Sequence, residues 1–106
     1  MFLDPRARKF DKQEARAILS EELEKVRKLG YAKLRKLFIE QKQIKNFEIT
    51  ATSGVDYQVE IQGWWDGEPD KDILISGGID NGGLSAYVPL SDSFIMRRDG
   101  SLAENQ

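Results

Sequence analysis

Four carboxylates alternate with other residues in the segment WWDGEPDKD, which spans residues 64–72. Alternating oxygen ligands are typical of calcium loops, but an EF-hand loop needs Gly at its sixth position and a bidentate Glu at its twelfth. Counted from Asp66, those positions hold Lys71 and Gly77. We therefore interpret residues 66–72 as a solvated acidic hairpin loop, with ion binding as the alternative. We expect no metal site and no cofactor.

The chain has no His and no Cys among its 106 residues. It therefore lacks a thiolate nucleophile, the Cys ligands of zinc sites and the usual near-neutral general base. Catalysis would depend on groups such as Glu60, Asp80 and Tyr87, and no spacing brings two of them together as an acid–base pair. We predict no catalytic residues, and a small-ligand enzyme with carboxylates on an open sheet face is kept as an alternative.

Composition predicts one folded domain over residues 1–106, with 40% hydrophobic and 32% charged residues. The N-terminal residues MFLDPRARKF lack the apolar core of a signal peptide, and no run approaches the length of a membrane span. We therefore expect no membrane partner and a cytoplasmic location.

Charge divides the chain into a basic front and an acidic back. Residues 1–46 carry 13 Lys and Arg against 7 Asp and Glu, whereas residues 47–106 carry 3 against 11. The basic run at 25–45 could contact a nucleic-acid backbone, but it has no recognition-helix motif and the whole chain is acidic. A nucleic-acid-associated protein is therefore an alternative, and mutual attraction of the two halves is the preferred interpretation.

Two helices are predicted in the first half, over residues 11–29 and 31–45. Asp11 followed by Glu14 is typical of a helix N-terminus, and Gly30 can end the first helix. The apolar residues recur at three- and four-residue steps, which indicates one buried stripe on each helix. These residues are Ala15, Ile18, Leu19, Leu23 and Val26 in the first helix, and Tyr31, Leu34, Leu37 and Phe38 in the second.

From Phe47 the apolar period changes to two, which predicts an antiparallel sheet over residues 47–90. Asn81-Gly82 favours a two-residue hairpin turn, which would pair Ile79, Gly77, Ile75 and Ile73 with Leu84, Ala86, Val88 and Leu90. The same parity pairs Trp65 with Ile73, Gly63 with Ile75, and Ile61 with Gly77. We predict an α+β fold in two layers, with two N-terminal helices on one face of a four-stranded antiparallel meander. Residues 91–106 are expected to form a turn or short helix and a tail.

The register separates the two adjacent tryptophans. Trp65 shares parity with the core residues, whereas Trp64 points to the face that the helices do not cover. Its predicted neighbours on that face are Leu74, Tyr87 and Pro89. Exposed apolar patches often mark contact sites, so we predict that these four residues bind another protein or a second copy of the chain. The alternative is that the C-terminal residues cover them.

The order of motifs in residues 47–102 resembles a group of small bacterial proteins without an assigned function. The motifs are YQVEIQ, an aromatic pair before an acidic turn, ISGGIDNGG, PLSDSFI and a terminal DGS. The resemblance implies a bacterial domain and carries over no site residue. The preferred function is a non-catalytic interaction or self-associating module.

Overall fold

Helix α1, Lys12–Arg27, begins where the Asp11 carboxylate accepts a hydrogen bond of 3.1 Å from the Glu14 N–H. This contact satisfies one of the free donors of the first turn. The buried stripe of α1 is Ala15, Leu19, Leu23 and Val26, as the spacing predicts. Gly30 follows the helix with a φ of 82°, a left-handed conformation that suits Gly. The first predicted helix is confirmed.

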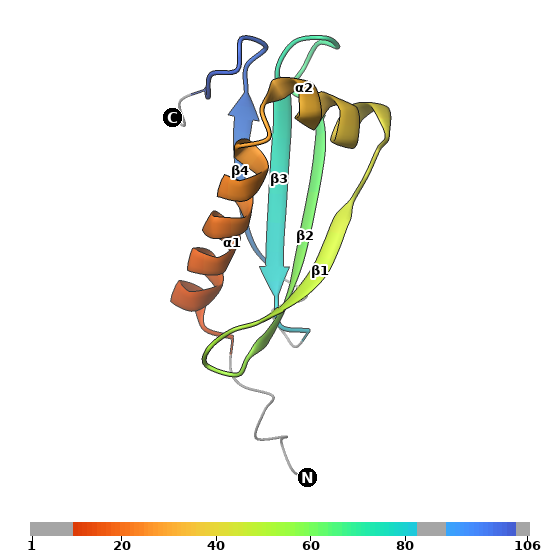
Figure 1. The fold of residues 1–106 in the computed structure, drawn as a ribbon. Helices are drawn as coiled ribbons and strands as arrows, with labels where there is room; N and C mark the ends of the chain where they lie inside the picture. Colours follow the sequence, from red (N-terminus) through yellow and green to blue (C-terminus); the bar gives the residue numbers. More distant parts are fainter. Residues whose placement is uncertain (1–9, 83–88, 104–106) are drawn as a thin grey trace.

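The computed structural model describes residues 10–82 and 89–103, and it has the predicted two layers (Figure 1). Helices α1, α2 (Tyr31–Leu34) and η1 (Arg35–Glu40) lie on one face of a four-stranded antiparallel sheet. The strands are β1 (Lys45–Thr50), β2 (Asp56–Trp65), β3 (Ile73–Asp80) and β4 (Leu90–Met96), in the order β1-β2-β3-β4. The α+β class is therefore confirmed. Within the described ranges, no helix has the length and apolar character needed to cross a membrane.

The second predicted helix ends five residues early. It begins at Tyr31 as expected, but residues Arg35–Glu40 form a π-helix, in which the Gln41 N–H donates to the Lys36 carbonyl at 2.9 Å. This wider turn has poorer packing along its axis than an α-helix and is seldom extended. Lys42 then adopts a φ of 51°, and the chain turns toward β1.

The register between β2 and β3 is the one that the sequence predicts. Trp65 pairs with Ile73, Gly63 with Ile75, and Ile61 with Gly77. The two glycines allow the helices to approach closely. A Cβ atom on Gly77 would lie 2.9 Å from Leu19 Cδ1 of α1, and one on Gly63 would lie 2.9 Å from Phe38 Cβ of η1.

The predicted fourth strand is wrong. Strand β4 is Leu90–Met96, and it pairs Ile79 with Leu90, Ile75 with Phe94, and Ile73 with Met96. Residues 83–88, where the predicted strand began, lie outside the described part of the chain. The observed register places Phe94 and Met96 over the core, which removes more apolar surface from water than Val88 and Leu90 could at those positions. It also leaves Pro89 before the strand, where its missing N–H breaks no ladder. The short helix expected after residue 91 is replaced by this strand.

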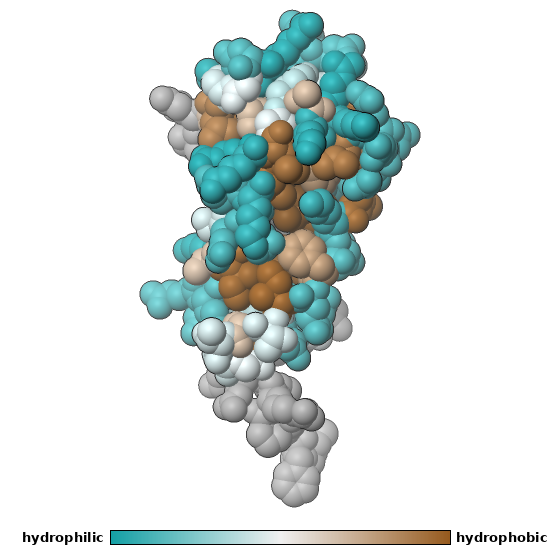
Figure 2. All heavy atoms as spheres, in the orientation of Figure 1, coloured by the Kyte–Doolittle hydropathy of each residue, from teal (hydrophilic) through white to brown (hydrophobic). Residues whose placement is uncertain are grey.

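Helix α1 covers only part of the inner sheet face. A helix with its side chains is about 10–12 Å wide, whereas four strands span roughly 19 Å. Helix α1 packs against β3 and β4, and η1 packs against β2. The inner side chains Phe47 and Ile49 of β1 are therefore only half-buried. Figure 2, which views the molecule from the side that carries the helices, shows hydrophobic side chains between polar ones.

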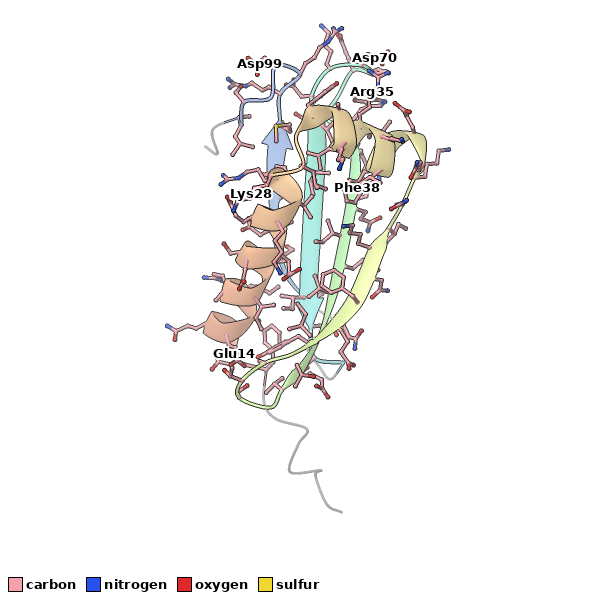
Figure 3. All side chains as sticks on the ribbon, viewed as in Figure 1. Glu14, Lys28, Arg35, Phe38, Asp70 and Asp99 are labelled. Carbon is pink, nitrogen blue, oxygen red and sulfur yellow. The ribbon has the colours of Figure 1, made fainter. Side chains whose placement is uncertain are left out.

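Tyr57 joins the start of α1 to the sheet. Its hydroxyl donates to Glu14 Oε1 at 3.0 Å and accepts from the Asp11 N–H at 3.4 Å. Glu14, labelled at the foot of α1 in Figure 3, also accepts a hydrogen bond of 2.6 Å from Ser53 in the turn between β1 and β2. Phe10 packs edge-on against the Tyr57 ring, with ring centres 5.8 Å apart. The first turn of α1 is thus fixed to the lower end of the sheet.

Gly63→Ala is expected to lower the free energy of unfolding by about 1–3 kcal/mol, because the new Cβ would overlap Phe38 Cβ and Ile75 Cδ1. Gly78→Ala is the matched control, since it lies on the next strand and its Cβ would have its nearest contact at 3.9 Å. Urea denaturation followed by circular dichroism measures both. Equal unfolding midpoints for the two variants would contradict the close approach of η1.

Tyr57→Phe is expected to change how stability depends on alkaline pH. Burial first, and then Glu14, raise the pKa of Tyr57 above its ordinary value of about 10. The folded state therefore holds this proton more tightly, so its contribution to stability is complete below about pH 10 and is lost as the pH rises through the folded pKa. At pH 7, Tyr57→Phe should be about 1 kcal/mol less stable than the wild type, because the hydrogen bonds of the hydroxyl are lost. Between pH 10 and 11, the stability of the variant should fall less than that of the wild type, because Phe has no proton to release. Urea denaturation at pH 7, 10 and 11 measures both proteins. A difference in stability between them that stays constant over this range would contradict the expected effect.

Candidate functional site

The outer face of the sheet is polar except at one end. Its polar side chains bond to one another across the strands, as Gln58 Nε2 does to Glu48 at 2.8 Å and Thr50 Oγ1 does to Asp56 at 2.5 Å. At the other end the register aligns three apolar side chains, which we call the outer row. They are Trp64, Leu74 and Ile95.

The structure brings together only part of the predicted contact patch. Trp64 and Leu74 are cross-strand neighbours, as expected. The neighbour of Leu74 on the other side is Ile95, where the sequence predicted Pro89. Pro89 is exposed and precedes Leu90, which pairs with Ile79 at the opposite end of β3. Tyr87 lies outside the described residues.

A groove next to Trp64 was not predicted. It has a volume of about 400 Å³, and we call it the Trp64 groove. Its lining is mostly apolar and comes from η1, from the end of β2 and from residues 41–44, which connect η1 to β1 and which we call the connector. The residues are Phe38, Ile39, Lys42, Gln43, Ile44, Gln62, Gly63, Trp64 and Trp65.

The groove contains the two most exposed large hydrophobic side chains of the described residues. Ile44 is 59% exposed and Trp64 is 47% exposed. The sequence signal for Ile44 was present but weak, because an isolated apolar residue in QKQIKN belongs to neither the helical stripe nor the strand alternation. Ile44 becomes part of a site only because the fold places the connector beside the end of β2.

Unequal strand lengths form one wall of the groove. The pairing of β1 with β2 ends at Lys45 and Ile61, so within residues 10–82 and 89–103 the segment Gln62–Trp65 pairs with β3 alone. The connector does not replace β1 there, since the Gln43 N–H donates back to the Leu37 carbonyl at 2.9 Å. The end of β2 therefore presents a sheet edge to the groove.

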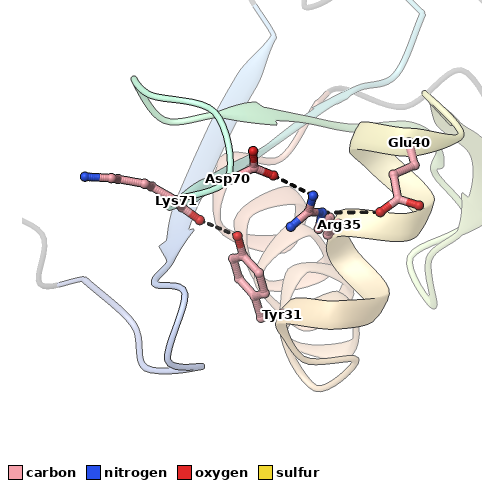
Figure 4. Close-up of polar contacts among 5 residues, drawn as sticks. All are labelled: Tyr31, Arg35, Glu40, Asp70 and Lys71. Atoms are coloured by element: carbon pink, nitrogen blue, oxygen red, sulfur yellow. Dashed lines mark hydrogen bonds and ion pairs between the residues drawn. The ribbon is translucent and has the colours of Figure 1, made fainter.

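Arg35 holds the acidic loop against the helices (Figure 4). Its guanidinium lies 2.5 Å from Asp70, 3.3 Å from Glu40 and 5.3 Å from the centre of the Trp65 ring. Beside it, the Tyr31 hydroxyl donates to the Lys71 carbonyl at 2.5 Å. The loop is thus fixed next to the groove, and its charge is partly balanced by Arg35.

The carboxylates of the loop do not converge on a common point. Asp70 binds Arg35, Glu68 lies 3.1 Å from Lys71, and Asp72 accepts from the Arg98 N–H at 3.4 Å. In residues 10–82 and 89–103, no group of three potential ligand side chains could hold a metal ion.

The two carboxylates proposed for an enzyme each accept a hydrogen bond from another group. Glu60 accepts from Gln62 at 3.1 Å, and Asp80 accepts from the Gly82 N–H at 2.7 Å. Glu60 pairs across the strands with Gly78, and Asp80 pairs with Gln58. Neither carboxylate therefore faces the other as a cross-strand acid–base pair.

Carboxylates also engage part of the basic run at 25–45. Lys25 pairs with Glu22, Arg27 with Glu24, and Arg35 with Asp70 and Glu40.

Comparison of the chain with protein-family models, with curated proteins and with solved structures found no match. The function must therefore be inferred from the site itself.

Arg35→Ala is expected to release the acidic loop and to lower the free energy of unfolding by about 1 kcal/mol. The loss is small because solvent screens these partly exposed charges. Hydrogen exchange at residues 66–72 should become faster. Lys36→Ala is the matched control, since Lys36 is exposed and makes no ion pair among the described residues. Unchanged exchange in Arg35→Ala would show that Arg35 does not hold the loop.

Proposed function

We propose that this protein is a non-catalytic interaction module that binds another protein through the Trp64 groove and the outer row. The observation that carries the proposal is that Ile44 and Trp64, the two most exposed large hydrophobic side chains described, line the same groove. Single exposed apolar residues are common on soluble proteins, but grouped ones mark contact surfaces. A cytoplasmic location and a bacterial origin, both expected from the sequence, belong to the same proposal.

The chemistry of the groove suits a protein partner. Trp is enriched among the residues that contribute most to interface affinity, particularly where it borders a pocket that becomes dry on binding. A volume of about 400 Å³ can accept one or two large side chains. Gln43, Gln62 and Lys42 add polar groups to the mostly apolar lining, and interfaces usually combine an apolar centre with polar groups.

The outer row extends this surface onto the sheet. Leu74 is half-buried beside Trp64, and Ile95 follows it on β4. The proposed surface thus keeps Trp64 and Leu74 from the sequence prediction and adds Ile44 and Ile95.

A nucleic-acid partner is the second candidate. Lys28, Lys33 and Lys36 are exposed and form no ion pair within the described part of the chain. Phosphate contacts by such side chains would produce a complex that weakens steeply with added salt. A shift of a labelled oligonucleotide at low salt would favour this function over the first.

Capture from a lysate of the source organism tests the proposal with the double variant Ile44→Ser and Trp64→Ser. Because about half of each side chain is exposed, the variant should remain folded, with a loss of about 1 kcal/mol or less. Its yield of the captured protein, measured by quantitative mass spectrometry, should fall about ten-fold or more relative to the wild type. The purified captured protein should show the same difference in a direct titration.

The double variant Lys28→Ser and Lys33→Ser is the matched control, and it should capture the same protein as the wild type. Equal capture by the groove variant and the wild type would refute the proposal. Unfolding of the groove variant would also refute it, because these side chains would then be needed for the core. Sedimentation of the wild type identifies a second copy as the partner if the mass doubles.

A further inference from the structure

Among the residues that the structure describes, the end of β2 is an unpaired strand edge that faces the Trp64 groove. Residues Gln62–Trp65 pair with β3 on one side, and β1 stops at the pair Lys45 and Ile61. In an antiparallel strand, each residue directs both its N–H and its C=O to the same side, and successive residues alternate between sides. Two of these four residues therefore direct both groups toward the groove.

The neighbouring connector leaves this edge open. Gln41 and Gln43 donate their N–H groups to carbonyls of η1, each at 2.9 Å. No backbone hydrogen bond joins residues 41–44 to residues 62–65. Natural proteins usually protect a free strand edge by covering it or placing charge on it. Here the edge belongs to a groove that is also lined by two exposed apolar side chains, Ile44 and Trp64.

One side chain gives the groove its charge. Lys42 is the only charged residue among those that line it, and it makes no ion pair within the described ranges. The nearby Arg35 is already engaged by Asp70 and Glu40. Lys42 also has a φ of 51°, a conformation that non-glycine residues seldom adopt. Within the lining, Lys42 therefore offers a cation to an anionic group, while the carboxylates of the acidic loop lie outside the lining.

We infer that the occupant of the Trp64 groove is a short extended segment of another protein, which adds a strand to β2 at Gln62–Trp65. The segment carries an apolar side chain that packs between Ile44 and Trp64, and a carboxylate that pairs with Lys42. This inference rests on the proposed function and specifies the chemistry of the partner. Strand addition supplies main-chain hydrogen bonds, and the side chains on either side supply specificity. Four residues of edge correspond to about 13 Å of chain.

The probe is a library of random dodecapeptides displayed on phage and selected on the full chain, with the variant Ile44→Ser and Trp64→Ser used for counter-selection. Enriched peptides should alternate apolar residues and include Asp or Glu. The most enriched peptide is then synthesised with a fluorescein label, and its affinity is measured by fluorescence anisotropy.

Two backbone-methylated forms of this peptide provide the decisive comparison. One form carries N-methyl groups at odd positions of the paired segment, and the other carries them at even positions. Only alternate N–H groups of an added strand face the edge of the sheet. One form should therefore bind about ten-fold more weakly or worse, and the other should bind within a few-fold of the parent. Equal affinities of the two forms would overturn strand addition.

Lys42→Gln tests the carboxylate. It should weaken binding about two- to five-fold and reduce the dependence on salt, as expected for an exposed ion pair. Lys36→Gln is the control and should leave both unchanged. An unaltered affinity in Lys42→Gln would overturn this part of the inference.

The outcome is separable from that of the proposed function. If the lysate protein is captured through Ile44 and Trp64 but no peptide is enriched, the inference fails while the proposed function stands. Doubling of the mass in sedimentation, with the groove variant remaining monomeric, would also overturn the inference, since the occupant would then be a second copy. If both the capture and the peptide selection fail, both are wrong.

Discussion

The register between β2 and β3 is the constraint on which the rest of the fold depends. It sets Ile61 against Gly77 and Gly63 against Ile75, so each glycine leaves space beside a large side chain on the inner face. Helix α1 uses the first space and η1 uses the second. A shift of one residue would move both glycines outward and turn Trp64 into the core. The positions of the helices and the exposure of Trp64 follow from this single pairing.

The sequence was sufficient for this pairing but not for the fourth strand. The alternation in β2 and β3 is long and contains glycines, so one parity is clearly better than the other. The prediction for β4 relied on the local turn preference of Asn81-Gly82. Residues 84–90 alternate more regularly than Leu90–Met96, yet the second segment prevails because Phe94 and Met96 pack on the core. Tertiary burial decided between two segments that local rules could not rank.

The candidate site was predictable only where parity determines it. Trp64 and Leu74 follow from the strand pattern. Ile44 and the groove depend on two features that periodicity does not encode. One is the end of β1 four residues short of the end of β2, and the other is the π-helical turn at Arg35–Glu40. Residues 34, 37 and 38 fit an ordinary α-helix equally well, so the spacing alone could not reveal the wider turn.

The opposite orientations of the adjacent tryptophans also have a spectroscopic consequence. Trp64 and Trp65 are the only indoles in the chain. Trp65 is half-buried against the Arg35 guanidinium, whereas Trp64 is 47% exposed. The intrinsic emission of the native protein is therefore the sum of one shielded and one hydrated fluorophore, both of which border the same groove. The molecule thus carries its own optical reporter at the surface where a partner would bind.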